Sequence, residues 1–291
     1  MADGEPIGSI AVLGTGTMGG PMARNLAAAG LDVRAWNRSR ESADPLADHG
    51  VELADSPADA AAGVDAVLTM LPDGDVVREV MQAGALEAMG NGAIWIQTST
   101  VGLTATEHLK ELADASGVQL VDAPVLGTKQ PAEEGALIVL ASGPKELEAR
   151  CRPAFEAVGS KAVWLGEAGA GSRMKLILNS WLVALVAGLA ETISLARALG
   201  EDPVRFLEII DGGPIGLPYA ELKGRAMVER DYPASFSLQL AEKDAKLVVE
   251  AAEQAGLSPQ LAKAAVRMYE RAAELGHGDE DMAAVIEAYG R

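Results

Sequence analysis

The chain has 291 residues, which is enough for about two domains with a sizeable hydrophobic core. Its formal net charge of −18 argues against nucleic acids and anionic membrane surfaces as partners, because both would repel it. The single cysteine, Cys151, excludes a disulfide framework and favours a reducing compartment. No secretory signal is visible near Met1, and the longest apolar run, Trp181 to Ala190, is about half of a bilayer span. We therefore expect a cytoplasmic protein without a membrane partner.

The first predicted elements form a dinucleotide-binding pattern. A strand-like run, Ser9 to Leu13, precedes the turn Gly14-Thr15-Gly16-Thr17-Met18-Gly19 and a helix-forming segment, Pro21 to Ala29. In this pattern the first glycine makes a tight turn, the second lets the backbone approach a pyrophosphate and the third lets the helix pack closely. The helix N-terminus would direct free N–H groups at the phosphates. An ordinary strand-to-helix turn is the alternative, which the flanking strand and helix disfavour.

The end of the second strand indicates which cofactor is bound. The run Val33 to Trp36 leads into Asn37-Arg38-Ser39, whereas an NAD site places Asp or Glu there. The Arg38 guanidinium can hold a 2′-phosphate through two parallel hydrogen bonds, and Asn37 and Ser39 can add neutral donors. This pattern predicts NADPH or NADP, with NADH less favoured, unless Arg38 is only a solvated surface cation. Leu71 and Pro72, after the next strand-like run, are further candidates for cofactor contacts.

Strand-like and helical segments then alternate as far as about residue 165. Further strands are predicted at residues 66–70, 93–97, 119–122, 137–140 and 162–164, and Ser56-Pro57 is a helix-start signal before residues 58–62. After the glycine-rich segment 166–171 no convincing strand follows, and helices are predicted at 172–199, 203–210, 238–255, 259–275 and 279–289. The pattern predicts an α/β Rossmann domain with a doubly wound, mostly parallel sheet at residues 1–167, followed by an all-helical domain at 168–291. The cleft between two such domains is the natural ligand site.

The start of the long helix carries the candidate catalytic groups. Lys175 and Asn179 are four residues apart, so they share one helix face. The surrounding residues are apolar, and we expect this helix to be buried almost all round. A lysine in such surroundings beside a positively charged nicotinamide loses proton affinity and can exchange a proton near neutral pH, while Asn179 can orient the substrate oxygen or the lysine. A lysine that snorkels from a buried helix or pairs with a carboxylate is the structural alternative.

These motifs, taken together, resemble the β-hydroxyacid dehydrogenase family. The family includes 3-hydroxyisobutyrate dehydrogenases and the glyoxylate or succinic semialdehyde reductases, and it is related to 6-phosphogluconate dehydrogenases. The resemblance implies that Lys175 is the catalytic lysine and Asn179 its substrate-orienting partner. It also implies that Ser99 and Thr100 line the nicotinamide and substrate site and that Lys243 reaches the cofactor from the helical domain. The motifs that carry it are Gly14 to Gly19 with Met22 to Leu26, Thr98-Ser99-Thr100, Asp122-Ala123-Pro124-Val125, Lys175 with Asn179, and Lys243-Asp244.

One segment departs from the family pattern. The family loop usually continues Asp-Ala-Pro-Val with Ser-Gly-Gly, whereas this chain has Leu126, Gly127 and Thr128. Leu126 removes one donor to a substrate carboxylate, while Gly127 and Thr128 keep backbone N–H groups and add a hydroxyl. Each charged hydrogen bond contributes about 1.5 to 3 kcal/mol, so we expect a carboxylate to bind still, but less tightly. A bulkier or less polar carbonyl compound is the alternative, unless Leu126 only packs the loop.

The sequence thus predicts an NADPH-dependent oxidoreductase that transfers hydride between the nicotinamide and a small aldehyde, keto acid or β-hydroxy acid, with Lys175 as general acid and base. We expect no metal, because the three histidines are scattered without ligand spacing. The alternatives are an imine reductase, which usually has another residue in place of Lys175, and a non-catalytic nucleotide-sensing protein, which the retained Lys175, Asn179 and Lys243 disfavour. A long apolar helix in a small domain commonly needs a second subunit to cover it, so we expect a homodimer.

Overall fold

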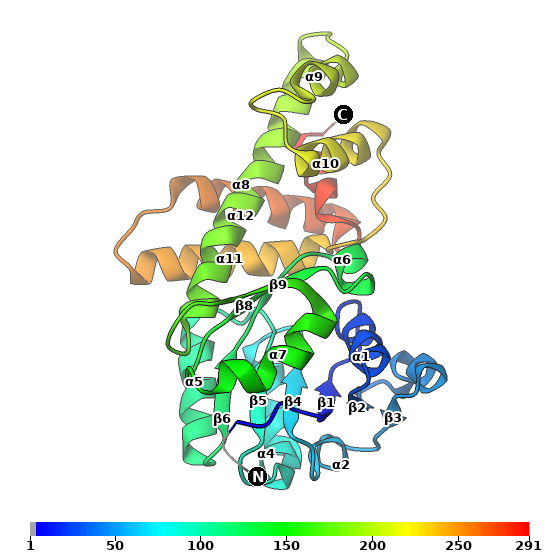
Figure 1. The fold of residues 1–291 in the computed structure, drawn as a ribbon. Helices are drawn as coiled ribbons and strands as arrows, with labels where there is room; N and C mark the ends of the chain where they lie inside the picture. Colours follow the sequence, from blue (N-terminus) through cyan, green and yellow to red (C-terminus); the bar gives the residue numbers. More distant parts are fainter. Residues whose placement is uncertain (1–3, 291) are drawn as a thin grey trace. The chain divides into compact units, whose positions relative to one another are not determined.

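The computed structural model describes residues 4–290, and the chain forms two compact units, Met1–Lys175 and Leu176–Arg291 (Figure 1). We call these the first and the second unit. The division falls inside the longest helix, α8 (Ala170–Ala198), which begins in the first unit and continues into the second.

A six-stranded parallel sheet is the centre of the first unit. Its strand order is β3-β2-β1-β4-β5-β6, and each neighbouring pair is parallel. The chain places β2 and β3 on one side of β1 and the later strands on the other, which is the predicted doubly wound arrangement. The short strand β3 was not predicted, because its two residues are too few to show a periodic pattern. The strands are β1 (Ser9–Leu13), β2 (Asp32–Trp36), β3 (Glu52–Leu53), β4 (Ala66–Thr69), β5 (Ile94–Gln97) and β6 (Gln119–Asp122).

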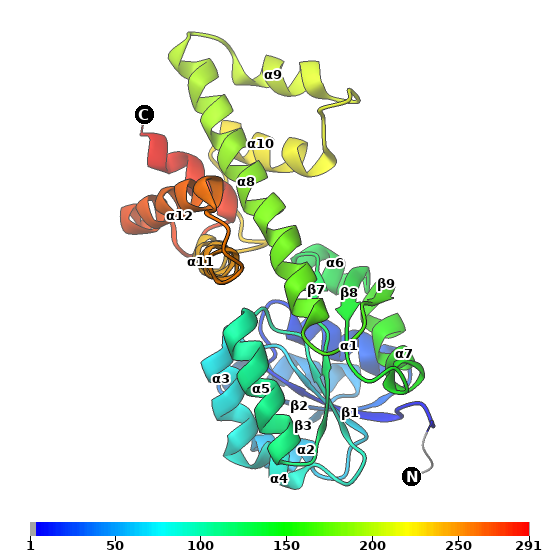
Figure 2. The same ribbon diagram turned by 90° about the vertical axis from the view of Figure 1, so that its left-hand side faces the viewer.

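Helices cover both faces of this sheet. In Figure 2, α3 and α5 lie side by side on one face, and α1 and α7 lie on the other. Alternate residues of β1 therefore enter different cores: Ile10 and Val12 pack with α1 and α7, whereas Ala11 and Leu13 pack toward α3 and α5. The α-helices of the first unit before α8 are α1 (Gly19–Ala28), α2 (Pro57–Ala61), α3 (Gly74–Val80), α4 (Leu86–Ala88), α5 (Leu103–Ala115), α6 (Lys129–Glu133) and α7 (Leu147–Val158), with tighter or wider turns at Arg40–Ser42, Asp44–His49 and Met81–Ala85.

The predicted cap before α2 is confirmed. The Ser56 hydroxyl accepts a hydrogen bond from the Asp59 N–H at 3.0 Å, and Pro57 occupies the first helical position. Proline has no N–H to leave unsatisfied there, which is why this pair of residues starts a helix well.

A second, three-stranded sheet has the order β7-β8-β9 and uses β7 (Val125–Leu126), β8 (Leu137–Ala141) and β9 (Gly159–Trp164). The predicted strands at 137–140 and 162–164 therefore exist, but they do not extend the parallel sheet. β7 is antiparallel to β8 and was not predicted, because two residues again show no pattern. Paired backbone hydrogen bonds between Asp122 and Ser142 join the ends of β6 and β8.

The second unit is helical, and residues 176–290 contain no strand longer than a single bridge between Ser237 and Asp281. Besides the rest of α8 it contains α9 (Pro203–Ile210), α10 (Pro218–Glu229), α11 (Leu238–Gln254) and α12 (Gln260–Ala272), followed by a wide turn at Ala273–His277 and a 3-10 helix at Met282–Tyr289. The sequence pattern missed α10, whose apolar residues are scattered around the helix. The predicted all-helical character is confirmed.

The expectation that α8 is buried almost all round is wrong. Val183, Val186, Ala190 and Ile193 are fully buried, but Ile177, Trp181 and Leu195 are 62%, 64% and 55% exposed. By length and composition alone α8 could cross a membrane, with a mean hydropathy of 1.8 in its most apolar window and 44% of that window buried. A core helix passes the same test, so this property does not choose between a lipid and a protein neighbour.

Candidate active site

The predicted cofactor residues of the first unit gather at one end of the parallel sheet. The chain reverses the direction of strand addition between β1 and β4, and such a switch point opens a crevice beyond the carboxyl ends of the strands. The glycine loop 14–19 follows β1, and Leu71 and Pro72 come shortly after β4. The segments 37–39 and 99–100 follow β2 and β5 at the same end.

The three glycines of the loop have the surroundings that the motif requires. Gly14 has a φ of 99°, and a Cβ there would collide with the carbonyl oxygen of Met70. A Cβ at Gly19 would collide with the carbonyl oxygen of Gly14, so the helix can begin this close to the turn only with glycine. A Cβ at Gly16 would meet no protein atom within 4 Å. The loop is therefore tight at its two ends and open at its middle, where a pyrophosphate needs room.

The loop also presents unsatisfied polar groups. The Thr15 hydroxyl belongs to a residue that is 4% exposed, and its oxygen has no hydrogen-bond partner among residues 4–290. No side chain caps the N-terminus of α1, which begins after Met18. Free N–H groups at a helix start together with a buried, unpartnered hydroxyl fit a phosphate ligand.

Asn37 ties the glycine loop to the end of β2. Its Oδ1 accepts from the Thr15 N–H at 3.0 Å, and its Nδ2 donates to the Ser39 carbonyl oxygen at 2.9 Å. Oδ1 and one of the two Nδ2 hydrogens are therefore used within the protein. Asn37 thus fixes the glycine loop, and its role as a donor to a 2′-phosphate stays a prediction.

Two neighbouring arginines have different surroundings. Arg40 pairs with Asp55 at 2.5 Å and with Asp44 at 3.5 Å. Arg38 is exposed and makes no hydrogen bond or ion pair with the part of the chain that the structure describes. Of the two guanidinium groups, only that of Arg38 keeps all its donors for a ligand.

Ser99 has a supporting position. It is 1% exposed, its Oγ accepts from the Leu71 N–H at 2.8 Å, and its backbone is held by the Gln97 side chain through contacts of 2.7 and 2.9 Å. Ser99 thus fixes the loop that contains Leu71, next to half-buried Thr100. Gln97 was not singled out from the sequence, although a polar residue at the last position of a buried strand was the available signal.

The segment that departs from the family pattern begins in β7. Leu126 is half-buried and pairs with Ile138 of β8. Gly127 has a φ of 138°, which favours glycine at this turn. Thr128 precedes the first residue of α6, and its hydroxyl makes no cap hydrogen bond. Its side chain is half-buried, so the hydroxyl stays available to a ligand.

Lys175 and Asn179 are both buried, with exposed fractions of 7% and 1%, and they stand one turn apart on α8. In the second unit Asn179 Nδ2 donates to Asp244 Oδ2 at 2.9 Å. Lys243 Nζ lies 3.0 Å from Asp244 Oδ1 as a charge contact. The structure thus joins Asn179 and Lys243 through Asp244, a residue for which the sequence suggested a motif but no role.

The side-chain amide oxygen of Asn179, Oδ1, is an unsatisfied acceptor in the group formed by Asn179, Lys243 and Asp244. Because its Nδ2 faces Asp244, the Oδ1 points to the other side of the amide, and it has no hydrogen-bond partner among the described residues. A buried acceptor without a donor costs about 1 to 3 kcal/mol, so it indicates a ligand that donates a hydrogen bond there.

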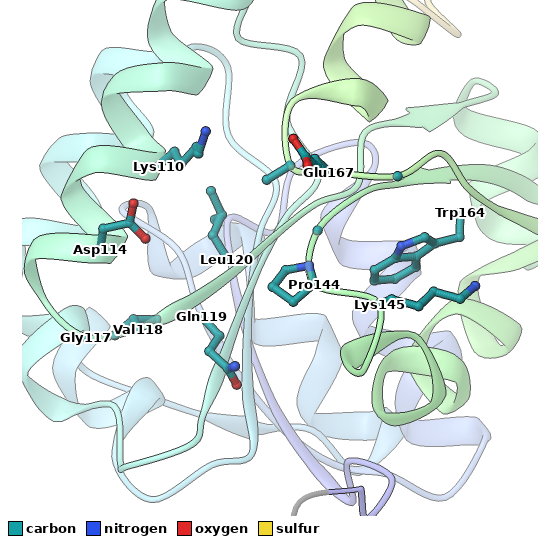
Figure 3. A pocket seen from close by; sticks show the side chains of 13 residues that line it. Lys110, Asp114, Gly117, Val118, Gln119, Leu120, Pro144, Lys145, Trp164 and Glu167 are labelled. Atoms are coloured by element: carbon teal, nitrogen blue, oxygen red, sulfur yellow. The ribbon is translucent and has the colours of Figure 1, made fainter.

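A cavity of about 720 Å³ lies elsewhere in the first unit, along the outer edge of β6 (Figure 3). Lys110 and Asp114 reach it from α5, and Pro144, Lys145 and Trp164 line its other side. None of the predicted site residues lines this cavity. Its two lysines are matched by Asp114 and Glu167, so its charge selects no ligand class.

Cys151 is fully buried in α7, and this burial raises the pKa of its thiol to about 12. A thiol that stays protonated at neutral pH is a poor nucleophile. Cys151 is therefore a packing residue of α7.

Family models match nearly the whole chain. The NAD binding domain of 6-phosphogluconate dehydrogenase matches residues 9–166, and the NAD-binding domain of NADP-dependent 3-hydroxyisobutyrate dehydrogenase matches residues 169–289. The chain belongs to the β-hydroxyacid dehydrogenase family. Like other members of this family, it is an NAD(P)-dependent oxidoreductase.

Individual members of this family align over most or all of their own length. Glyoxylate/succinic semialdehyde reductase 2 of Arabidopsis thaliana, a chloroplastic protein, is 37% identical over 96% of this chain and 79% of its own. Reductase 1 of the same plant is 34% identical over 96% of this chain and 97% of its own. The solved structure of Mycobacterium tuberculosis 3-hydroxyisobutyrate dehydrogenase with L-serine is 31% identical, covers 98% of this chain and 100% of its own, and has a TM-score of 0.87.

Proposed function

We propose that the protein is an NADPH-dependent reductase of small aldehydes and keto acids, which in reverse oxidises the corresponding hydroxy acids. The two plant relatives are named for glyoxylate and succinic semialdehyde, and these are the first substrates to test. The observation that carries the proposal is the buried, unpartnered Oδ1 of Asn179, one helical turn from buried Lys175. Together they offer a hydrogen-bond acceptor and a proton donor to one small polar molecule.

In the proposed reaction NADPH, when bound, supplies the hydride to the carbonyl carbon. Lys175 as an ammonium group donates a proton to the carbonyl oxygen, so that an aldehyde becomes a primary alcohol. In the oxidative direction neutral Lys175 accepts the hydroxyl proton of the alcohol. Asn179 accepts a hydrogen bond from the substrate hydroxyl or from Lys175, and Asp244 keeps its amide from turning over.

The preference for NADPH rests on Arg38. Its exposed guanidinium has no partner among residues 4–290, stands directly after β2, and can grip a 2′-phosphate with two parallel hydrogen bonds. No carboxylate occupies positions 37–40, where one would accept from the ribose hydroxyl of NAD.

Lys175→Met tests the catalytic proposal. The substitution keeps an unbranched side chain but removes the proton, so kcat with glyoxylate or succinic semialdehyde should fall by about 10²- to 10⁴-fold, while the Kd for NADPH stays within about twofold. The control is Lys161→Met, an exposed lysine in β9. A Lys175→Met enzyme with near-normal kcat would remove the proposed role.

An imine reductase is the second candidate, and Leu126 is the observation that favours it, because a leucine in place of a hydroxyl suits an uncharged substrate. Turnover of cyclic imines, tested beside glyoxylate, succinic semialdehyde and 3-hydroxy acids, separates the two activities. NADPH binding without turnover of any of these compounds would instead favour a nucleotide-sensing protein.

We further propose that the enzyme is a homodimer joined along α8. Ile177, Trp181, Gly188 and Leu195 repeat at spacings of four and seven residues, so they form one exposed stripe on the helix. A Cβ at Gly188 would meet no atom within 4 Å, which leaves the middle of this α8 stripe open to close approach. Two copies related by a two-fold axis can pack these stripes against each other, because an isologous interface uses the same surface of both subunits. Lys175 and Asn179 lie on the opposite side of α8 by helical spacing.

A further inference from the structure

The carboxylate of Asp122 caps α8 from a distant part of the chain. Asp122 ends β6, is 1% exposed, and accepts from the Ser172 N–H at 2.8 Å and from the Ser172 hydroxyl at 2.7 Å. The Ser142 hydroxyl lies 3.1 Å from the same carboxylate and accepts from the Gly171 N–H at 2.9 Å. Two of the N–H groups that every helix leaves open at its start are thus satisfied by residues from β6 and from just after β8.

The backbone around Gly171 is packed too closely to accept a side chain at this position. A Cβ at Gly171 would collide with the carbonyl oxygen of Leu140 and would lie 2.9 Å from the carbonyl oxygen of Asp122. Both obstacles are main-chain atoms of paired strands, which cannot move aside cheaply. Gly171 therefore fixes how closely the first turn of α8 approaches the strands, and the two hydrogen bonds between Ser172 and Asp122 fix the rotation of this turn about the helix axis.

Capping a helix with a buried carboxylate costs free energy, because the charged group is removed from water. Burial raises the pKa of Asp122, and no cation pairs with it among the residues described. The hydrogen bonds from Ser172 and Ser142 and the positive end of α8 offset part of that cost. A serine or threonine would satisfy one N–H at a lower cost, but its single oxygen cannot replace the two carboxylate oxygens that hold the N–H and the hydroxyl of Ser172 together.

The position of Lys175 depends on this fixed first turn of α8. It follows Ser172 by three residues and Gly171 by four, so it lies one turn further along the same side of α8. We propose that Asp122 is a positioning residue for Lys175: by setting the rotation and depth of α8 through Ser172, it aims the amine at the reacting oxygen. This inference rests on the proposed catalytic role of Lys175.

Two substitutions at position 122 test it. Asp122→Ala keeps the backbone pairing with Ser142 but removes the side-chain cap, so kcat should fall by about 10²-fold, the cost of a misplacement of about 1 Å. Asp122→Asn should restore most of the activity, to within about tenfold of the native kcat. Its Oδ1 can accept from the Ser172 N–H, and its Nδ2 can donate to the Ser172 hydroxyl, whose own proton can turn to Thr106 Oγ1 at 3.1 Å.

A matched control separates positioning from general stability. Asp65 also accepts two backbone N–H groups, those of Gly8 and Ser9, but it makes no contact with α8. Asp65→Ala should lower the Tm and leave kcat unchanged at temperatures where the enzyme is folded. If Asp122→Ala likewise lowers only the Tm, or if Asp122→Asn is as inactive as Asp122→Ala, the positioning role is wrong.

The double variant Asp122→Ala/Lys175→Met shows whether Asp122 acts through the lysine. Loss of the cap should reduce kcat no further once Lys175 is absent, since its effect depends on that amine. An additional 10²-fold loss in the double variant would overturn the inference while leaving Lys175 as the acid. A Lys175→Met enzyme with normal kcat would instead overturn the proposed function, whatever Asp122→Ala does.

Should Asp122→Ala fail to fold, Ser172→Ala gives the same test in milder form. It retains the N–H bond to Asp122 and loses only the hydroxyl bond. We expect about a tenfold loss of kcat with an unchanged Kd for NADPH, and an unchanged kcat would contradict the inference.

Discussion

The side chains of Asn179 and Asp244, 65 residues apart in the chain, meet through a hydrogen bond of 2.9 Å inside the second unit. This bond decides which end of the Asn179 amide faces the protein and which end is left unpartnered. Asp244, which is 4% exposed, therefore sets the orientation of the Asn179 amide.

Asp244→Ala should lower kcat/KM by about 10- to 100-fold, because a hydrogen bond to a charged group contributes about 1.5 to 3 kcal/mol and the Asn179 amide loses its anchor. Asp244→Asn keeps an acceptor oxygen and should lose less. Steady-state kinetics with glyoxylate or succinic semialdehyde provide the measurement. Glu253→Gln, on the same helix α11, is the control. Equal activity of Asp244→Ala and the native enzyme would show that Asn179 needs no anchor.

The two arginines after β2 give a matched pair for cofactor choice. Arg38→Asp should raise the KM for NADPH steeply and improve the use of NADH, since a carboxylate repels the 2′-phosphate and accepts from the ribose 2′-hydroxyl. Arg40→Ala should leave the preference unchanged, because Arg40 is already engaged with Asp55 and Asp44. The measurement is kcat/KM for both cofactors in each variant. If Arg38→Asp keeps the native preference, the assignment of NADPH to Arg38 is refuted.

The α8 stripe predicts a concentration-dependent dimer. Trp181→Lys places a charge in the middle of the apolar stripe and should convert the dimer into a monomer in light-scattering experiments without detergent. Leu257→Lys, which changes a 64% exposed leucine outside α8, is the control and should leave the mass unchanged. A native enzyme of monomeric mass would contradict the dimer.

The buried ion pair of the second unit predicts acid sensitivity. Burial opposes the ionisation of Asp281, but the hydrogen bond and the charge of Lys223, at 2.7 Å, together with hydrogen bonds from the Ala283 N–H and the Ser235 hydroxyl, lower the pKa of this carboxyl below its usual value. Because the folded-state pKa is the lower one, the unfolded chain binds more protons. The stabilisation is therefore complete above about pH 4 and is lost as the pH falls through the folded-state value.

Asp281→Asn tests this ion pair. At neutral pH the loss of one partner of a buried pair should cost about 3 to 5 kcal/mol of the free energy of unfolding, measured with urea. The difference from the native protein should shrink below about pH 4. Glu148→Gln in the exposed pair with Lys145 should cost about 0 to 1 kcal/mol. A native-like free energy of unfolding for Asp281→Asn at neutral pH would mean that the pair contributes little.

Local features of this protein could be predicted from the sequence because they depend on neighbouring residues. The tight turn at Gly14, the cap at Ser56 and the helical spacing of Lys175 and Asn179 follow from backbone conformation and from residues at most a few positions apart. The apolar runs of the central strands are equally local, since strands buried on both faces need no partner to show their composition.

Other features depend on which distant segments meet. Composition measures how much apolar surface α8 has, but not what covers it, so the exposed side at Trp181 was missed. The placement of β8 and β9 in a separate sheet depends on pairing with β7, a strand too short to show a pattern. Likewise Arg38 and Arg40 have the same chemistry, and the positions of Asp44 and Asp55 decide that Arg40 is the one engaged in ion pairs.

The sequence by itself determined the family, the order of the longer strands and of most helices along the chain, and the residue types that carry the chemistry, because motifs and periodicity act over short spans. Only the tertiary structure decided that Asp122 holds Ser172 and that Asp244 holds Asn179. Hydrogen bonds across 50 and 65 residues have no local signature. They exist because packing of the strands and helices brings these side chains together in a buried place, where an unpaired carboxylate or amide would be costly.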